Sequence, residues 1–174
     1  MEALASTRSI AAMANRERDS LTAALHGART HVLAQLEGLS DADLRRSVLP
    51  SGWHCLGLVR HLTLSDERYW FEVVMAGGSL DWWPTAENGD WLVGQDESAE
   101  DVLATYRAAI EASDAVITAM SLDEAPRRRE PQWPENRFAD LRSVLQHVIV
   151  ETATHAGHLD AARELLDGQQ YLVM

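Results

Sequence analysis

The sequence is poor in cysteine, proline and glycine, and it contains no lysine. Its single cysteine, Cys55, cannot form a disulfide within the chain, which excludes disulfide-stapled secreted domains and fits a reducing cytoplasm. The prolines and glycines are clustered, so long segments are free of residues that break helices. No strand-like alternation of apolar and polar residues persists, and no internal repeat is present. These absences predict an all-α protein.

The sequence also lacks the features of a secretory signal and of a membrane-spanning helix. The N-terminal residues lack the basic and apolar regions of a secretory signal. No apolar run approaches the roughly 18–20 residues that a membrane-spanning helix needs. We therefore expect a soluble cytoplasmic protein with no membrane partner.

Positive charge is scarce as well. The 174 residues include 15 Arg against 27 Asp plus Glu, for a formal net charge of −12, which disfavours binding to nucleic acids and anionic membranes. Hydrophobic residues make up 46% of the chain, enough to build a core and to argue against disorder. The length suits one domain over residues 1–174.

Apolar residues recur at spacings of three and four in four segments, which predict long helices at about residues 15–39, 53–76, 98–120 and 138–167. Ser40 is a candidate N-cap for a short helical turn at 41–46, and Ser98 begins a pattern like a capping box. Gly168 is suited to end the last helix. The chain therefore predicts a bundle of four helices.

The connections between the second and third helices and between the third and fourth are too long for simple bundle turns. Long loops in small domains often carry function, so we expect the mouth of any site near them. Trp83, Trp91 and Trp133 are candidate wall residues. The alternative is that these tryptophans cover the ends of the bundle.

The last helix carries an unusual group of chemically active side chains. On a helical wheel His155 lies about 20° and Glu151 about 60° from Val148, which belongs to the apolar stripe, so both side chains are expected to face the core. A carboxylate in an apolar interior costs several kcal/mol unless it is paired or binds a cation. Glu151 and His155, one turn apart, are therefore candidate metal ligands. The alternatives are a hydrogen bond within the helix or an ion pair with an Arg.

The other histidines and the cysteine give weaker signals. His61 lies at the edge of the apolar arc of segment 53–76, either as a ligand from a facing helix or as a half-buried surface residue. His147 and His158 flank the stripe of the last helix, and His26, His31 and His54 are expected near the surface. Cys55 falls on an apolar arc, where a buried thiol stays protonated.

Two segments resemble the DinB-like superfamily of metal-binding four-helix proteins. The first is Ser51-Gly-Trp-His-Cys-Leu-Gly-Leu-Val-Arg-His61-Leu with Glu67 beyond, and the second is Glu151-Thr-Ala-Thr-His155-Ala-Gly-His158-Leu-Asp-x-x-Arg163-Glu164. The resemblance covers nearly the whole chain. It implies an all-α, DinB-like four-helix bundle with long loops between helices 2 and 3 and between helices 3 and 4.

The resemblance also implies a ligand set. The superfamily typically carries one His on its second helix and a His-x-x-x-His pair on its last, and His61 and His155 match two of these positions. Glu151 replaces the first His of the pair, which looks like the His, Glu, His set of mycothiol-dependent maleylpyruvate isomerase. His61, Glu151 and His155 are thus the implied ligands of a divalent metal, Zn²⁺ or Ni²⁺. His158 is expected to contact a ligand or the substrate rather than the metal.

Such a site leaves positions on the metal open to a thiol, a water molecule or a carbonyl group. With a low-molecular-weight thiol such as mycothiol or bacillithiol, the protein would be an S-transferase or a thiol-dependent isomerase acting on an electrophilic substrate. With water it would be a hydrolase. A third alternative is a non-catalytic, stress-related metal-binding module. The sequence does not identify the catalytic residues.

The sequence indicates the cofactor contacts and the oligomeric state less directly than it indicates the metal ligands. Arg68 and the arginines Arg127, Arg128, Arg129 and Arg137 offer positive charge to an anionic cofactor or substrate, with a solvated basic loop as the alternative. Arg68, Arg127 and Trp83 are the candidate cofactor contacts. A homodimer is implied by the resemblance alone.

Overall fold

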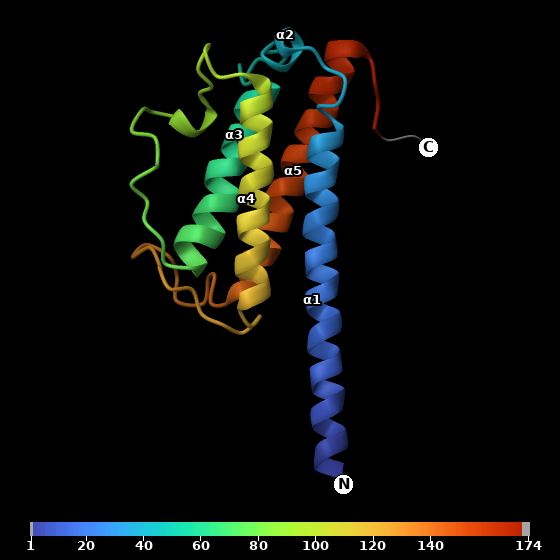
Figure 1. Cartoon of the computed structure of the whole chain (residues 1–174), viewed down its shortest axis with the longest axis vertical. Helices are drawn as coiled ribbons and strands as arrows, with labels where there is room; N and C mark the ends of the chain where they lie inside the picture. The colour runs from blue at the N-terminus through green and yellow to red at the C-terminus, as the bar shows by residue number, and fades with distance from the viewer. Residues whose placement is uncertain (1, 172–174) are drawn as a thin grey trace.

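The described part of the chain consists of helices joined by loops. The computed structural model describes residues 2–171, with side chains from residue 15 onward. Its long helices are α1 (Glu2–Ala34), α3 (Cys55–His61) with its direct continuation η1 (Leu62–Met75), α4 (Ala99–Ala119) and α5 (Leu141–Asp167). Helix α1 packs along α5, and η1 packs along α4 (Figure 1). No strand occurs within residues 2–171, so the all-α, DinB-like bundle is confirmed.

The predicted helix ends are formed by side-chain caps. Ser40 accepts a hydrogen bond from the backbone N–H of Asp43 and begins the short helix α2 (Asp41–Leu44). Ser98 accepts from the N–H of Asp101 and begins α4. Gly168 ends α5 with a φ of +81°, a conformation that glycine adopts without steric cost. These three signals were sufficient to place helix ends because each acts locally.

The bounds of two helices differ from the sequence prediction. Helix α1 begins at Glu2 rather than near residue 15, because the alanine-rich segment 2–14 continues the helix, and it ends at Ala34 rather than near 39. Helix α5 begins at Leu141 rather than at 138. Phe138 has a left-handed φ of 52° and is buried, and Asp140 caps the helix through a capping box. Packing of Phe138 therefore decides where the last helix begins.

The second long helix departs from the α-helical geometry that the sequence predicts. After His61 the turns widen into a π-helix, in which a backbone N–H reaches the carbonyl five residues earlier, as Ala76 does to Phe71 at 3.0 Å. Wider turns rotate each residue by less than the 100° of an α-helix, so the wheel used for segment 53–76 is wrong beyond its first turns. Residues four and five apart, such as His61, Asp66 and Trp70, then follow one face.

The core consists of two apolar clusters separated by buried polar side chains. The first cluster includes Leu25, Ile117 and Val148. The second lies further along the same helices and includes Val32, Tyr106 and Ala156. Between them lies a set of buried polar residues from all four helices, which we call the polar layer: Arg29, Asp66, Glu67, Ser113 and Thr152.

The two long loops lie outside the bundle. The connection from η1 to α4 covers the side of the α3–η1 helix away from α1 and contains the short helix η2 (Gly89–Trp91) (Figure 1). The connection from α4 to α5 crosses the end of the bundle at which η1 finishes. Of the helices described, none has the length and apolarity needed to cross a membrane.

Candidate active site

Two histidines from different helices meet beside the η1–α4 loop. His61 ends α3 and His155 lies on α5, and their ring centroids are 5.0 Å apart in an edge-on arrangement. Trp91 of η2 stacks on His61 with centroids 4.2 Å apart, and its ring also lies 5.8 Å from that of His155. The loop therefore returns to cover the pair, and the expected convergence of His61 and His155 is present.

The ring of His61 is held in place by a carboxylate. Its Nδ1 lies 2.7 Å from Oδ2 of Asp90, and Ser65 donates a hydrogen bond to the same oxygen at 3.0 Å. Because an ionised carboxylate only accepts hydrogen bonds, Nδ1 is the donating nitrogen in this contact, and Nε2 is not used in it. This is the arrangement in which a histidine is oriented to bind a metal through its other nitrogen.

Glu151 and His155 lie one turn apart on α5, as predicted, but not in an apolar interior. Oε2 of Glu151 is 4.0 Å from Nε2 of His155, and the Glu151 side chain is 40% exposed while that of His155 is 13% exposed. The expectation that both side chains face the core is therefore wrong for Glu151, whose carboxylate reaches the rim and stays partly hydrated. Burial, together with the neighbouring His61 and His158, lowers the pKa of His155 to about 4, so this imidazole is neutral at physiological pH.

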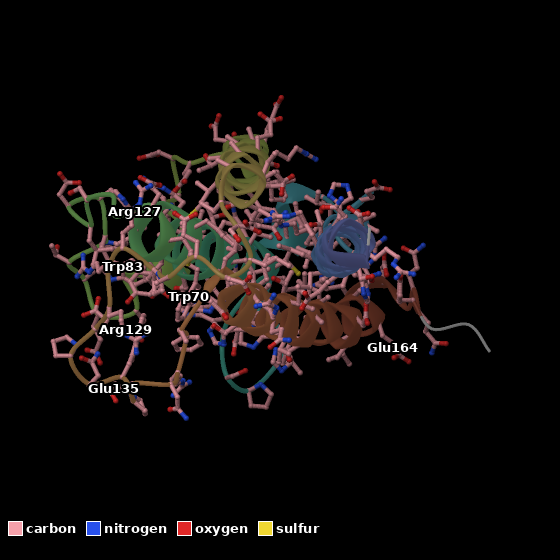
Figure 2. The ribbon with its side chains drawn as sticks, turned by 90° about the horizontal axis from the view of Figure 1, so that it is seen from below. Trp70, Trp83, Arg127, Arg129, Glu135 and Glu164 are labelled. Carbon is pink, nitrogen blue, oxygen red and sulfur yellow. The ribbon has the colours of Figure 1, made fainter. Side chains whose placement is uncertain are left out.

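A cavity of about 460 Å³ adjoins these residues. Its apolar wall consists of Tyr69, Trp70, Leu80 and Trp83, and its polar groups are His61, Ser65, Asp66, His147 and Glu151. Figure 2 shows Trp70 beside the helices and Trp83 further out among the loops, whereas Glu164 lies at the other end of the molecule. The cavity is thus mostly apolar, with acidic groups on the side towards the histidines.

Asp66 is the most unusual of these groups. Its side chain is 3% exposed, and no described residue forms a hydrogen bond with its Oδ2 atom. Burial, followed by the charges of Glu151 and Glu67, raises the pKa of Asp66 well above its ordinary value. Sequence reasoning missed Asp66 because the α-helical wheel does not describe η1, and it missed Asp90 because a loop brings that residue to His61.

The donor types of His61, Glu151 and His155 fit a divalent metal. Two neutral imidazoles and one carboxylate are ligands that Zn²⁺ takes in open, catalytic sites. As the side chains stand, however, no group of three or more His, Cys, Asp or Glu residues within the described part of the chain is arranged to hold a metal ion. Oε2 of Glu151 lies 4.0 Å from Nε2 of His155 in this arrangement.

The predicted cofactor contacts lie in three different places. Trp83 lines the cavity, with its ring centroid 6.1 Å from that of Tyr69. Arg68 points instead into a separate groove, where it pairs with Glu72 at 2.9 Å and lies 3.8 Å from the ring of Trp82. Arg127 is exposed on the loop side of the molecule and donates to the carbonyl of Ala76 at 3.4 Å (Figure 2). The structure therefore brings only Trp83 to the cavity.

The remaining candidates have local explanations. Nδ1 of the exposed His158 lies 3.5 Å from Nδ1 of His155, so His158 touches a candidate ligand. His54 caps α3 by accepting from the N–H of Gly57. Cys55 is a core residue, and burial raises the pKa of its thiol to about 11. The thiol therefore stays protonated and is not a nucleophile. Trp133 stacks on Trp70 with centroids 5.3 Å apart and covers the end of the bundle.

Comparison with known proteins identifies the family of the chain. A family model described as mycothiol-S-transferase matches residues 20–168, which include the C-terminal part of α1, the other long helices in full and every residue of the candidate site. No curated protein and no solved structure matches the chain. The match covers most of the sequence and agrees with the DinB-like resemblance of its two histidine-bearing segments. The chain therefore belongs to the mycothiol-S-transferase family.

Proposed function

We propose that the protein transfers a low-molecular-weight thiol of the mycothiol type to an electrophilic co-substrate. The observation that carries this proposal is the meeting of His61 and His155 beside a largely apolar cavity, within a chain of the mycothiol-S-transferase family. In the reaction the thiol loses its proton, a sulfur–carbon bond forms, and the leaving group departs with its bonding electrons.

His61, Glu151 and His155 would hold a divalent metal, Zn²⁺ or Ni²⁺. When bound, such a cation lowers the pKa of a thiol so that it is deprotonated at neutral pH. The chain prepares the ligands for this role. Asp90 fixes the ring of His61, and burial keeps His155 neutral, so the imidazole of His155 does not have to lose a proton first.

The rest of the site handles the co-substrate. Trp91 covers the two imidazoles and limits the access of water to them. Tyr69, Trp70 and Trp83 present aromatic surfaces on which an apolar electrophile packs close to His61. Holding the two reactants side by side is itself a large part of the catalysis in a transfer of this kind.

Two further expectations complete the proposal. The homodimer follows from the family resemblance, and sedimentation equilibrium of the purified full chain tests it. The cytoplasmic location follows from the lone cysteine, and fractionation of the producing cells tests it.

The direct test is a conjugation assay with mycothiol and 1-chloro-2,4-dinitrobenzene, whose aryl thioether is followed by its absorbance. We expect the His155→Ala variant to lose roughly 100-fold or more of the rate, because it lacks a ligand and a wall of the site. His26→Ala is the matched control, since His26 is exposed on α1, and should retain the wild-type rate. Equal rates in wild type and His155→Ala, or no rate above the uncatalysed reaction, would overturn the proposal.

A further inference from the structure

A buried carboxyl group faces the cavity with one oxygen that has no hydrogen-bond partner among the described residues. Asp66 lines the cavity, its side chain is 3% exposed, and its Oδ2 atom has no hydrogen-bond partner among the described residues. Leaving a buried polar group unbonded costs about 1–3 kcal/mol, so such groups are uncommon in folded proteins. A ligand that hydrogen-bonds this carboxyl group would recover that cost.

The surroundings of Asp66 restrict the charge of that ligand. The cavity holds a second carboxyl group, that of Glu151, and none of the described residues that line it is an Arg. His147 offers no compensating charge, since burial lowers the pKa of its imidazole. An anionic ligand would therefore meet acidic groups in a desolvated space without a cation from the protein wall.

The remaining wall favours an apolar body. Tyr69, Trp70 and Trp83 supply aromatic surface, and Leu80 completes the apolar part of the lining. The volume of about 460 Å³ lies within the range of pockets for small organic molecules. Burial and the neighbouring carboxylates raise the pKa of Asp66, which favours the protonated form, and that form has one O–H to donate.

We propose that Asp66 is the residue that selects the co-substrate, by hydrogen-bonding a carbonyl-type oxygen on a neutral, largely apolar molecule, and that the cavity rejects anions of the same shape. The identification of this ligand as the co-substrate rests on the proposed S-transferase function. The binding preference itself does not, because it follows from the cavity alone. If Asp66 had only a structural role, the cavity would show no such preference between ligands.

The test uses three probes that share a phenyl ring. Acetophenone carries the carbonyl oxygen, ethylbenzene has nearly the same shape without it, and benzoate is the anion. Their affinities are measured by isothermal titration calorimetry on the metal-free protein in the absence of any thiol, so that no bound cation attracts benzoate. For the wild type we expect acetophenone to bind about 5–10-fold more tightly than ethylbenzene, the worth of one hydrogen bond, and benzoate to bind more weakly than acetophenone.

Variants separate recognition from folding. Asp66→Leu should reduce the ratio of acetophenone to ethylbenzene affinity to about one, because it removes the donor and keeps the cavity apolar. Asp66→Asn should restore most of the ratio, since the amide N–H₂ also donates. Glu72→Gln is the matched control on the same helix, where Glu72 is half-exposed and lies outside the cavity lining.

An unchanged ratio in Asp66→Leu overturns the proposal, and so does benzoate that binds as tightly as acetophenone. Failure of conjugation in the mycothiol assay with these binding preferences intact would overturn the S-transferase function alone. Conjugation with no preference in binding would overturn the role of Asp66 alone. The two proposals thus fail separately.

Discussion

Asp66 and Glu67 are adjacent carboxyl residues on η1, both buried in the polar layer, and they have opposite surroundings. Glu67 accepts hydrogen bonds from Nε and Nη2 of Arg29 at 2.7 and 2.6 Å, and Nη1 of the same guanidinium binds Asp114 at 2.7 Å. Asp66 faces the cavity, and its Oδ2 has no partner among the described residues. The carboxylate of Glu67 therefore has its hydrogen-bond partners within the protein, whereas the carboxyl group of Asp66 remains able to bind a ligand.

The difference teaches how one layer of the bundle serves two purposes. On the side towards α1, the bidentate pair of Glu67 with Arg29 stabilises the junction between the two apolar clusters. On the side towards α5, Asp66 and the unbonded hydroxyl of Thr152 leave the layer polar but incompletely bonded. Polar groups kept at a cost to stability are commonly found at functional sites.

The largest effect on stability should come from removing the hydrogen-bonded carboxylate of Glu67. Glu67→Leu leaves the Arg29 guanidinium buried without its main partner, so we expect the free energy of unfolding to fall by about 3–5 kcal/mol. Urea denaturation followed by circular dichroism measures it. Glu72→Leu, on the same helix but with a half-exposed carboxylate, should change stability by only about 0.5 kcal/mol. A loss of similar size in both variants would show that the comparison between these carboxyl groups is wrong.

The next effect concerns the support of the imidazole pair. Asp90→Ala frees the ring of His61, so we expect the mycothiol conjugation rate and the affinity for the metal to fall by about 10–100-fold. Asp96→Ala, at an exposed position of the same loop, is the control and should leave both unchanged. A conjugation rate in Asp90→Ala equal to that of the wild type would remove the assigned role of Asp90.

A smaller change in stability, of opposite sign, should come from removing the unbonded carboxyl group of Asp66. Asp66→Leu replaces an unbonded buried carboxyl group with an apolar side chain, so we expect the free energy of unfolding at pH 8 to rise by about 1–3 kcal/mol. The same urea experiment measures this. A fall in stability comparable to that of Glu67→Leu would mean that Asp66 has a structural partner after all.

The pH dependence sharpens this prediction. The pKa of Asp66 is higher in the folded protein than its ordinary value of 3.8, so the folded state binds this proton more tightly than the unfolded state does. The contribution to stability is therefore complete below about pH 3.8 and is lost as the pH rises towards the folded pKa. Relative to Asp66→Asn, which does not titrate, the wild type should lose unfolding free energy over this interval. A wild type whose unfolding free energy rises relative to that of Asp66→Asn over the same interval would contradict the assignment.

The parts of the fold that were predictable depend on local signals. Ser40, Ser98 and Gly168 act within one turn of the chain, and the structure uses each of them as predicted. The π-helical turns of η1 were not predictable by assuming 100° per residue, since they depend on packing against α4 and α5. The start of α5 was misplaced for a similar reason, because the burial of Phe138 is a tertiary effect.

The same distinction holds for the candidate site. The spacing of Glu151 and His155, with the resemblance supplying His61, was enough to name residues that lie together at the cavity. Asp90 reaches His61 only because the loop folds back, which no local pattern encodes. Arg29 did leave a signal, since it interrupts the apolar spacing between Leu25 and Val32 and therefore required a buried partner.

The central claim is that the imidazole pair beside the cavity, and not the buried Arg29–Glu67 pair, is where the chemistry takes place. The most direct measurement is titration of the purified protein with Co²⁺ and then with mycothiol, followed by visible absorption, for wild type and His155→Ala. The account predicts that the wild type takes up Co²⁺ stoichiometrically and develops a sulfur-to-metal absorption band, and that His155→Ala does neither. Equal Co²⁺ uptake and the same thiol-dependent band in both proteins would contradict it.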